Sequence, residues 1–216
     1  MASTNQDPVA AGERLTFNLY WPSGIPLGEA VLQAAQSGAE VRLEATVTAD
    51  LPQHHVSYNF SSLADPQLCS LRFSETLREG SKTRQTTYEF DQVRNRIRRT
   101  QDGQVAELPA SPCARDPLAL LYHFRRQLAA GSLPAGGTQS AGTFYLGAEY
   151  AVDYQALASE TVKVGVKAWQ GERFQITATG GGSVQSLEVW FHPESARLPV
   201  AVRVPFSLAT FSAELQ

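Results

Sequence analysis

Residues 116–128 read DPLALLYHFRRQL, the stretch with helical periodicity in a chain whose other segments predict β-strands. Asp116 can accept a backbone N–H as the N-cap, and Pro117 has the φ angle preset for a first helical residue. Leucine and aromatic side chains then spread over a wide arc of the helix. Because Gly131 and Pro134 end the pattern, the sequence predicts one helix over about residues 116–130.

The rest of the chain largely alternates apolar and polar residues with a period of two, which is typical of strands with one buried face. Residues 41–48, VRLEATVT, show the clearest alternation. One-sided alternation favours an antiparallel sheet. Turns are predicted at residues 91–92, at Gly171, at residues 180–182 and at residues 192–195, with a loop over residues 131–142. Further strands are predicted over residues 15–21, 56–60, 68–73, 84–90, 93–99, 143–146, 149–154, 161–169, 173–179, 186–191, 199–205 and 210–215.

These elements predict a mainly β fold: a single strongly curved antiparallel sheet or partly open β-barrel, with one helix packed in its concave side. The 216 residues fit one large all-β domain or two small ones. A split near the loop over residues 131–142 is the alternative. One domain over residues 12–216 is favoured, because the strands before the helix need a partner layer. Residues 1–11 have no apolar signal-peptide core and predict a flexible lead, which fits an exported or a cytosolic protein equally.

Composition excludes several function classes. A net charge of −3 and a pI near 5.8 give no attraction to nucleic acid. The sequence contains no run of about 18 apolar residues, so it predicts no transmembrane segment. The spacing of the histidines encodes no metal site, and no nucleophile elbow or phosphate loop occurs. No cofactor is therefore predicted, and a non-enzymatic protein is favoured, although scattered carboxylates can still converge in three dimensions. The histidines are His54, His55, His123 and His192.

The two cysteines have two interpretations. Cys69 falls in a predicted strand, and Cys113 comes just before the helix. Their spacing matches no metal or redox motif, so both could be unpaired thiols, one of them packed in the core. A disulfide between the helix entrance and the strand is the other interpretation. Such a bridge would imply an oxidising compartment.

Four arginines are close together before the helix. On a strand, Arg94, Arg96 and Arg98 form one row of positive charge, and Arg99 faces the other side. Such a row can hold phosphate or carboxylate groups. In a chain with net negative charge, a solvated outer face or a protected edge strand is favoured.

Arg125 falls inside the apolar arc of the helix. A buried guanidinium needs a partner, because an unpaired charge in a core is strongly unfavourable. It either reaches the rim of the sheet or pairs with an acid or a ligand headgroup. In a ligand site, Arg125→Leu would abolish binding of an anionic amphiphile but not of a neutral apolar probe. A structural role, which leaves both probes unaffected, is favoured.

Aromatic residues recur at the alternating positions, and most are typical core residues. A curved sheet covered by a single helix can nevertheless leave a cavity that holds an apolar ligand. The predicted ligand contacts are the aromatic residues expected to face that space, with one arginine: Trp21, Tyr58, Phe60, Phe73, Tyr88, Tyr122, Phe124, Arg125 and Trp190.

Short motifs along the chain occur in an order that matches a known family. They are GERLTF at residues 12–17, PLGEA at 26–30, REG at 78–80, YEFD at 88–91, DPLALLY at 116–122, LEVW at 187–190 and RLPV at 197–200. With these motifs the chain resembles the bacterial exported domain-of-unknown-function 3108 family from about Gly12 to its end. The resemblance implies a secreted cell-envelope protein with a mainly antiparallel β fold and no established activity. It therefore favours the disulfide between Cys69 and Cys113 and a periplasmic or otherwise exported location.

Three functional hypotheses follow, in this order. The first is a non-enzymatic envelope protein that binds an apolar or amphiphilic ligand, such as a lipid, between sheet and helix. The second is an envelope scaffolding or assembly protein that uses its sheet surface for a protein partner and has a fully packed interior. The third is a hydrolase of envelope glycan or lipid, which would require converging acids or a Ser/His pair.

Overall fold

The computed structural model describes residues 7–9, 12–51, 54–133, 136–193, 197–206 and 209–216. Within these residues the chain forms one helix, α1 (Pro117–Ala129), and fifteen strands. Before the helix come β1 (Glu13–Tyr20), β2 (Pro26–Ser37), β3 (Glu40–Leu51), β4 (His54–Ala64), β5 (Ser70–Glu79), β6 (Lys82–Asp91), β7 (Arg96–Gln101) and β8 (Gln104–Pro109). After it come β9 (Thr138–Leu146), β10 (Ala148–Ala156), β11 (Glu160–Val164), β12 (Lys167–Gly180), β13 (Ser183–Phe191), β14 (Pro199–Phe206) and β15 (Ala209–Leu215).

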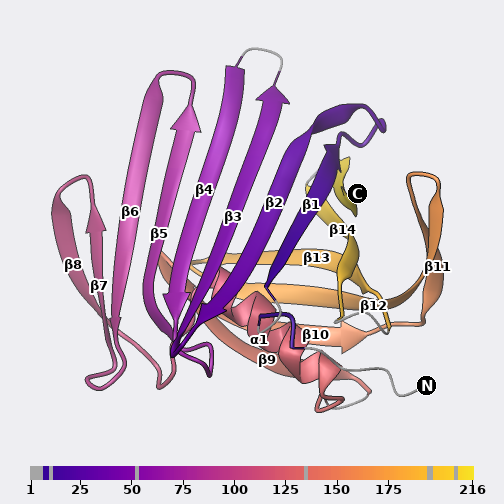
Figure 1. The fold of residues 1–216 in the computed structure, drawn as a ribbon. Helices are drawn as coiled ribbons and strands as arrows, with labels where there is room; N and C mark the ends of the chain where they lie inside the picture. The colour runs from indigo at the N-terminus through magenta and orange to yellow at the C-terminus, as the bar shows by residue number, and fades with distance from the viewer. Residues whose placement is uncertain (1–6, 10–11, 52–53, 134–135, 194–196, 207–208) are drawn as a thin grey trace.

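All these strands belong to one antiparallel sheet, in the order β8-β7-β6-β5-β4-β3-β2-β1-β15-β14-β13-β12-β10-β9, with β11 paired to β12. The last strand pairs with the first and places Leu215 opposite Phe17. In Figure 1, β1 to β8 form an upright wall, β9, β10, β12 and β13 cross below it, and α1 lies between the two halves. The predicted mainly β fold, with a strongly curved antiparallel sheet and a helix in its concave side, is confirmed.

The helix packs its apolar residues against both halves of the sheet. Leu118, Ala119 and Tyr122 join a core cluster with buried residues of β3 to β7, such as Leu43 and Phe73. The other arc of the helix joins a second cluster with residues of β9, β10, β12 and β13. That arc consists of Leu120, Phe124 and Leu128. One helix therefore supplies side chains to two cores and defines the inner face of the sheet.

The prediction of a single strand over residues 161–169 is wrong, because the structure has two strands there. Two strands, β11 and β12, meet there at a tight turn, and Gly165 has the positive φ of 57° that the turn requires. The turn predicted at Gly171 is also wrong, because that residue is buried inside β12. A Cβ atom on Gly171 would lie 3.0 Å from the indole of Trp190, so glycine allows close packing there.

Other predicted boundaries moved by a few residues. The loop over residues 131–142 is shorter than expected, because β9 begins at Thr138. Arg94 lies in the turn before β7 rather than on the strand.

Two strands, β2 and β8, were not predicted, and in β2 the run AVLQAAQ at residues 30–36 lacks alternation. Small apolar residues on both faces hide the period of two.

The predicted flexible lead over residues 1–11 lies mostly outside the described residues. Of its described part, Val9 is fully buried in the first core cluster. Asp7 makes an ion pair of 2.9 Å with Arg126 on the helix. These two residues fix that segment against the helix side of the fold.

Candidate functional site

The helix begins at a buried polar cluster. The carboxylate of Asp116 accepts hydrogen bonds from the Ser62 and Ser70 hydroxyls, both at 2.6 Å, and from the backbone N–H groups of Leu118 and Ala119. Burial raises the pKa of Asp116, and these hydrogen bonds act in the opposite direction. The cluster joins β4 and β5 to the helix N-terminus and fixes where the helix starts.

The predicted disulfide between Cys69 and Cys113 is confirmed. Its Cα atoms are 4.7 Å apart, and it joins the residue before β5 to the loop that leads into the helix. Next to it, the N–H of Ser70 donates to the carbonyl of Ala114. The bridge and the Asp116 cluster therefore hold the same entrance of the helix.

Arg125 is fully buried and has partners on three sides. Its guanidinium makes a bidentate ion pair with the carboxylate of Glu13 on β1. Its Nε donates to the carbonyl of Arg197 at 3.1 Å, and the ring of Tyr122 lies 5.0 Å from its Cζ. Burial, followed by the charge of Glu13, raises the pKa of Tyr122. The acid that a buried guanidinium requires is thus Glu13, and a contact of Arg125 with a ligand stays a prediction.

Four of the predicted ligand contacts form an aromatic ladder on the inner face of β4, β5 and β6. Successive ring centroids are 5.9 Å apart between Tyr58 and Phe60, 6.1 Å between Phe60 and Phe73, and 5.8 Å between Phe73 and Tyr88. Phe73 and Tyr88 are buried beside Tyr122 of the helix. Tyr58, at the other end, is 37% exposed.

Burial falls along these strands with distance from the helix. On β3, Val41, Leu43 and Ala45 are buried, whereas Val47 is only half-buried. The register places Val47 opposite Tyr58, and Tyr58 opposite Leu77, in one row across β3, β4 and β5. Figure 1 shows these strands extending well above the helix. We call Val47, Tyr58 and Leu77 the uncovered strip, because the helix covers the inner face only below them.

The remaining predicted contacts lie elsewhere. Phe124 packs in the second core cluster, with its ring centroid 5.3 Å from that of Tyr154. Trp21 is half-buried just after β1, and its ring lies 5.3 Å from that of Phe211. Trp190 is fully buried in a third cluster with Val162 and Val164 of β11, away from the helix. The structure thus brings together five of the nine predicted residues, Tyr58, Phe60, Phe73, Tyr88 and Tyr122, whose binding of a ligand stays a prediction.

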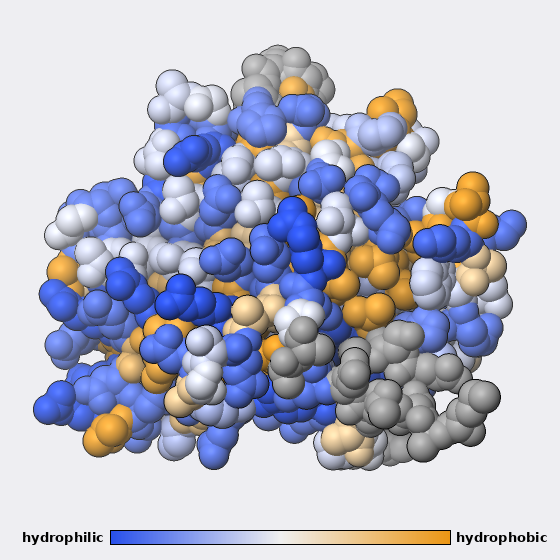
Figure 2. Space-filling view, in the orientation of Figure 1, coloured by the Kyte–Doolittle hydropathy of each residue, from blue (hydrophilic) through white to orange (hydrophobic). Residues whose placement is uncertain are grey.

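The β11–β12 hairpin covers Trp190 on the outer face of the sheet. The register places Trp190 on the opposite face of the sheet from Val189, and Val189 belongs to the core beneath the helix. The indole N–H donates to Glu160 at 2.9 Å, and the N–H of Gly165 donates to Glu214 on β15 at 3.3 Å. Figure 2 shows apolar residues gathered between this hairpin and the upright wall, on a face that is otherwise largely hydrophilic.

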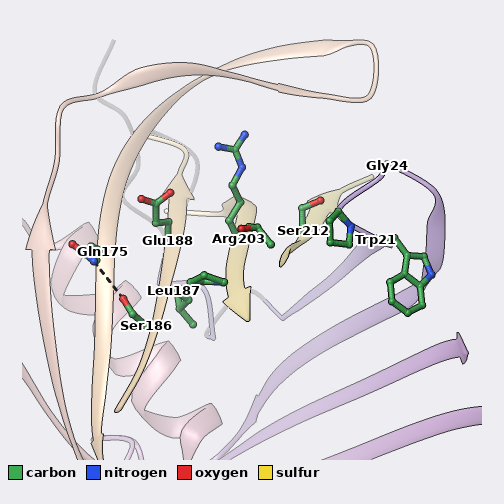
Figure 3. A pocket seen from close by; sticks show the side chains of 11 residues that line it. Trp21, Gly24, Gln175, Ser186, Leu187, Glu188, Arg203 and Ser212 are labelled. Carbon is green, nitrogen blue, oxygen red and sulfur yellow. Dashed lines mark hydrogen bonds between the residues drawn. The ribbon is translucent and has the colours of Figure 1, made fainter. Parts of the chain in front are cut away.

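Beside the hairpin, the outer face holds a hollow of about 560 Å³. Figure 3 shows Arg203 and Glu188 standing up from neighbouring strands beneath the hairpin, while the indole of Trp21 points away from them. The hollow is lined by Trp21, Pro22, Gly24, Gln175, Ser186, Leu187, Glu188, Arg203, Pro205, Thr210 and Ser212. Strand alternation in the sequence puts several of these polar residues on one face, but the cross-strand register that assembles them is not visible there.

The arginine row before the helix is exposed and ion-paired. Arg94 pairs with Asp91 at 3.0 Å, and Arg98 pairs with Glu89 at 3.4 Å. The contact from Arg96 to Glu107 is 4.0 Å. These pairs fit the favoured interpretation of a solvated face, although β7 is not the edge strand because β8 lies outside it.

The three histidines with described side chains occupy separate places in the fold. His55 pairs with Asp50 at an exposed site, and the ring centroid of His192 lies 5.3 Å from that of Trp169. Burial, followed by the charges of Arg115 and Arg126, lowers the pKa of His123 to about 4. The side chain of His54 lies outside the described residues. Over the described ranges, no three His, Cys, Asp or Glu residues are placed to hold a metal ion. No described helix is long and apolar enough to cross a membrane.

Several solved structures match this chain. The β-barrel-like protein of domain of unknown function DUF1849 from Brucella abortus is similar, with a TM-score of 0.65 at 12% sequence identity over 94% of both chains. A protein described as exported, with a YmcC-like fold, from Bacteroides fragilis has a TM-score of 0.35 at 12% identity, over 94% of this chain and 92% of that one. A protein described as a lipoprotein, from Parabacteroides distasonis, has a TM-score of 0.36 at 9% identity, over 96% and 95%.

The first of these similarities supports a curved, barrel-like sheet and extends no further than the fold. The search of curated proteins gives no match. The family model for the protein of unknown function DUF3108 matches residues 16–216. The match begins on β1 and includes the helix entrance, the aromatic ladder and the hairpin over Trp190. The chain therefore belongs to the DUF3108 family.

Proposed function

We propose that the protein acts in the cell envelope as a non-enzymatic binding protein for an apolar or amphiphilic ligand, such as a lipid. The observation that carries this proposal is the uncovered strip at the end of the aromatic ladder. Apolar side chains of adjacent strands are half-buried or exposed there, on the concave side of the sheet. Covering such a surface with an acyl chain removes apolar area from water and is favourable.

The ligand position that we propose lies outside the space between sheet and helix that the sequence suggested. Phe73, Tyr88 and Tyr122 fill that space and are almost completely buried. The ligand would instead lie above the helix, along Val47, Tyr58 and Leu77, with Phe60 at the lower end. The buried part of the ladder then acts as a rigid floor for the exposed part.

The disulfide supports the envelope location. The bridge between Cys69 and Cys113 is of the kind that forms and persists in oxidising compartments, such as the periplasm. Among the described residues no other cysteine is present, so no free thiol competes for it.

The test uses a neutral fluorescent probe, N-phenyl-1-naphthylamine, and native mass spectrometry of the exported protein for co-purified lipid. The wild-type protein should bind the probe, and Tyr58→Asp should weaken binding about tenfold or more, because burial of the tyrosine ring is lost. Val184→Asp is the matched control, since Val184 is 64% exposed and pairs with Thr179 on the outer face. That variant should bind like the wild type.

The alternative is a protein partner on the same strip, as expected of a scaffolding protein. A folded wild-type protein that takes up neither probe nor lipid would contradict the proposal and favour this alternative. Equal losses of probe affinity in Tyr58→Asp and Val184→Asp would show that the uncovered strip is not the binding site.

A further inference from the structure

The outer hollow has a polar floor made by one row of residues across four strands. The register places Gln175 of β12 opposite Glu188 of β13, Glu188 opposite Arg203 of β14, and Arg203 opposite Ser212 of β15. In Figure 3 the β11–β12 hairpin arches over one side of this row, and the turn that contains Gly24 lies at its other end. The hollow is thus a trough bounded by two turns, on the face opposite the helix.

Arg203 is exposed and lies over an aromatic residue. Its Cζ lies 4.8 Å from the ring centroid of Trp190, and the Trp190 indole is fixed by its hydrogen bond to Glu160. A cation–π contact of this kind involves the charge of the guanidinium and leaves its N–H groups able to donate to a ligand. No described hydrogen bond uses the donors of Arg203.

The acid next to Arg203 is already occupied. Glu188 accepts from Arg173 at 2.6 Å, and no ion pair joins Arg203 to any acid in the described ranges. Some other surface arginines, such as Arg94 and Arg98, have a carboxylate partner, whereas Arg14, like Arg203, has none among the described residues. The guanidinium of Arg203, in the floor of the hollow, therefore has no anionic partner among the described residues.

The other polar side chains of the hollow fit a hydroxylated ligand. Thr210 and Ser212 offer hydroxyl groups that both donate and accept, while the Gln175 amide and the Ser186 hydroxyl already share a hydrogen bond of 3.4 Å. The volume of about 560 Å³ lies in the range of small-molecule sites. From these observations we propose that the hollow binds a small polar ligand that carries a phosphate or carboxylate group, and that Arg203 binds this anionic group.

The site is distinct from the uncovered strip, because it lies on the other face of the sheet and takes a different class of ligand. Its test uses three sugar-derived probes in isothermal titration calorimetry: glucose 6-phosphate, gluconate and glucose. The wild-type protein should bind at least one of the two anions more tightly than glucose. Binding of one anion alone would tell phosphate recognition from carboxylate recognition.

Arg203→Gln should weaken binding of the preferred anion about tenfold or more, as expected for loss of a charge-assisted hydrogen bond. Arg203→Lys should retain part of the affinity. Arg14→Gln is the matched control: it removes the same charge from an exposed residue of β1 and should leave affinity unchanged. Circular dichroism confirms that each variant is folded.

Three results would overturn the proposal. The first is a wild-type protein that binds neither anion more tightly than glucose. The second is a folded Arg203→Gln variant with wild-type affinity. The third is an equal loss in Arg14→Gln, which would show attraction to surface charge in general. None of these results bears on lipid binding at the uncovered strip, so the two proposals fail separately.

Discussion

The guanidinium of Arg125 joins parts of the chain that are far apart in sequence. It connects the helix to Glu13 at the start of β1 and to the backbone of Arg197 just before β14. Arg125 is fully buried and the side chain of Glu13 is 11% exposed, so each charge depends on the other for compensation. Such a pair adds little net stability compared with an apolar pair, but breaking it leaves an unpaired buried charge.

Arg125→Leu should therefore lower the free energy of unfolding by about 3–5 kcal/mol. The double variant Glu13→Leu with Arg125→Leu should recover most of this loss, because no charge is then left unpaired. Urea denaturation of both single variants and the double variant gives the coupling energy. Additive effects in that cycle would show that the pair is not coupled.

At the scale of the element, the helix N-terminus is held by two independent sets of bonds. One set is the Asp116 cluster with Ser62 and Ser70, and the other is the disulfide between Cys69 and Cys113. The hydrogen bonds of the Asp116 cluster stabilise the helix in the native state. The disulfide, with a sequence separation of 44, acts mainly by restricting the unfolded chain.

Replacing both cysteines with serine should lower the free energy of unfolding by about 4 kcal/mol in the chain-entropy model. The helical signal in circular dichroism should persist under native conditions, because the Asp116 cluster remains. Loss of that signal in the folded variant would mean that the disulfide, and not the cluster, fixes the helix. Asp116→Ala with the disulfide intact is the matched comparison, since it removes the cap alone.

At the scale of the whole molecule, local patterns predicted the elements better than the sites. The cap at Asp116 and the alternation of residues 41–48 are local signals, and both led to correct elements. The uncovered strip depends on how far the helix reaches along β3 and β4, which no local pattern encodes. The trough around Arg203 depends on a register across β12, β13, β14 and β15, and the β1–β15 pairing brings the turn that contains Gly24 to its end. Sequence therefore indicated which residues alternate, but not which faces stay uncovered.

The single sheet and the shared helix also predict how the molecule unfolds. Phe124 packs among Tyr154, Phe174 and Phe191 in the second core cluster, whereas β3 and β4 belong to the first. If the described residues form one cooperative domain, Phe124→Ala should lower the global stability by about 3–5 kcal/mol. Because the helix and the β1–β15 pairing link the two cores, the slowest-exchanging amides of β3 and β4 should lose protection by the same free energy.

Native-state hydrogen exchange by NMR measures that protection strand by strand. Val93→Ala is the control, since Val93 is 93% exposed and its truncation should leave exchange unchanged. Two separate domains, divided near the loop over residues 131–142, would behave differently. Phe124→Ala would then reduce protection only in β9 to β15, and calorimetry would resolve two transitions. An equal loss of protection in the strands before and after the helix would instead show that neither half of the sheet is stable alone. This is expected when one helix completes both cores.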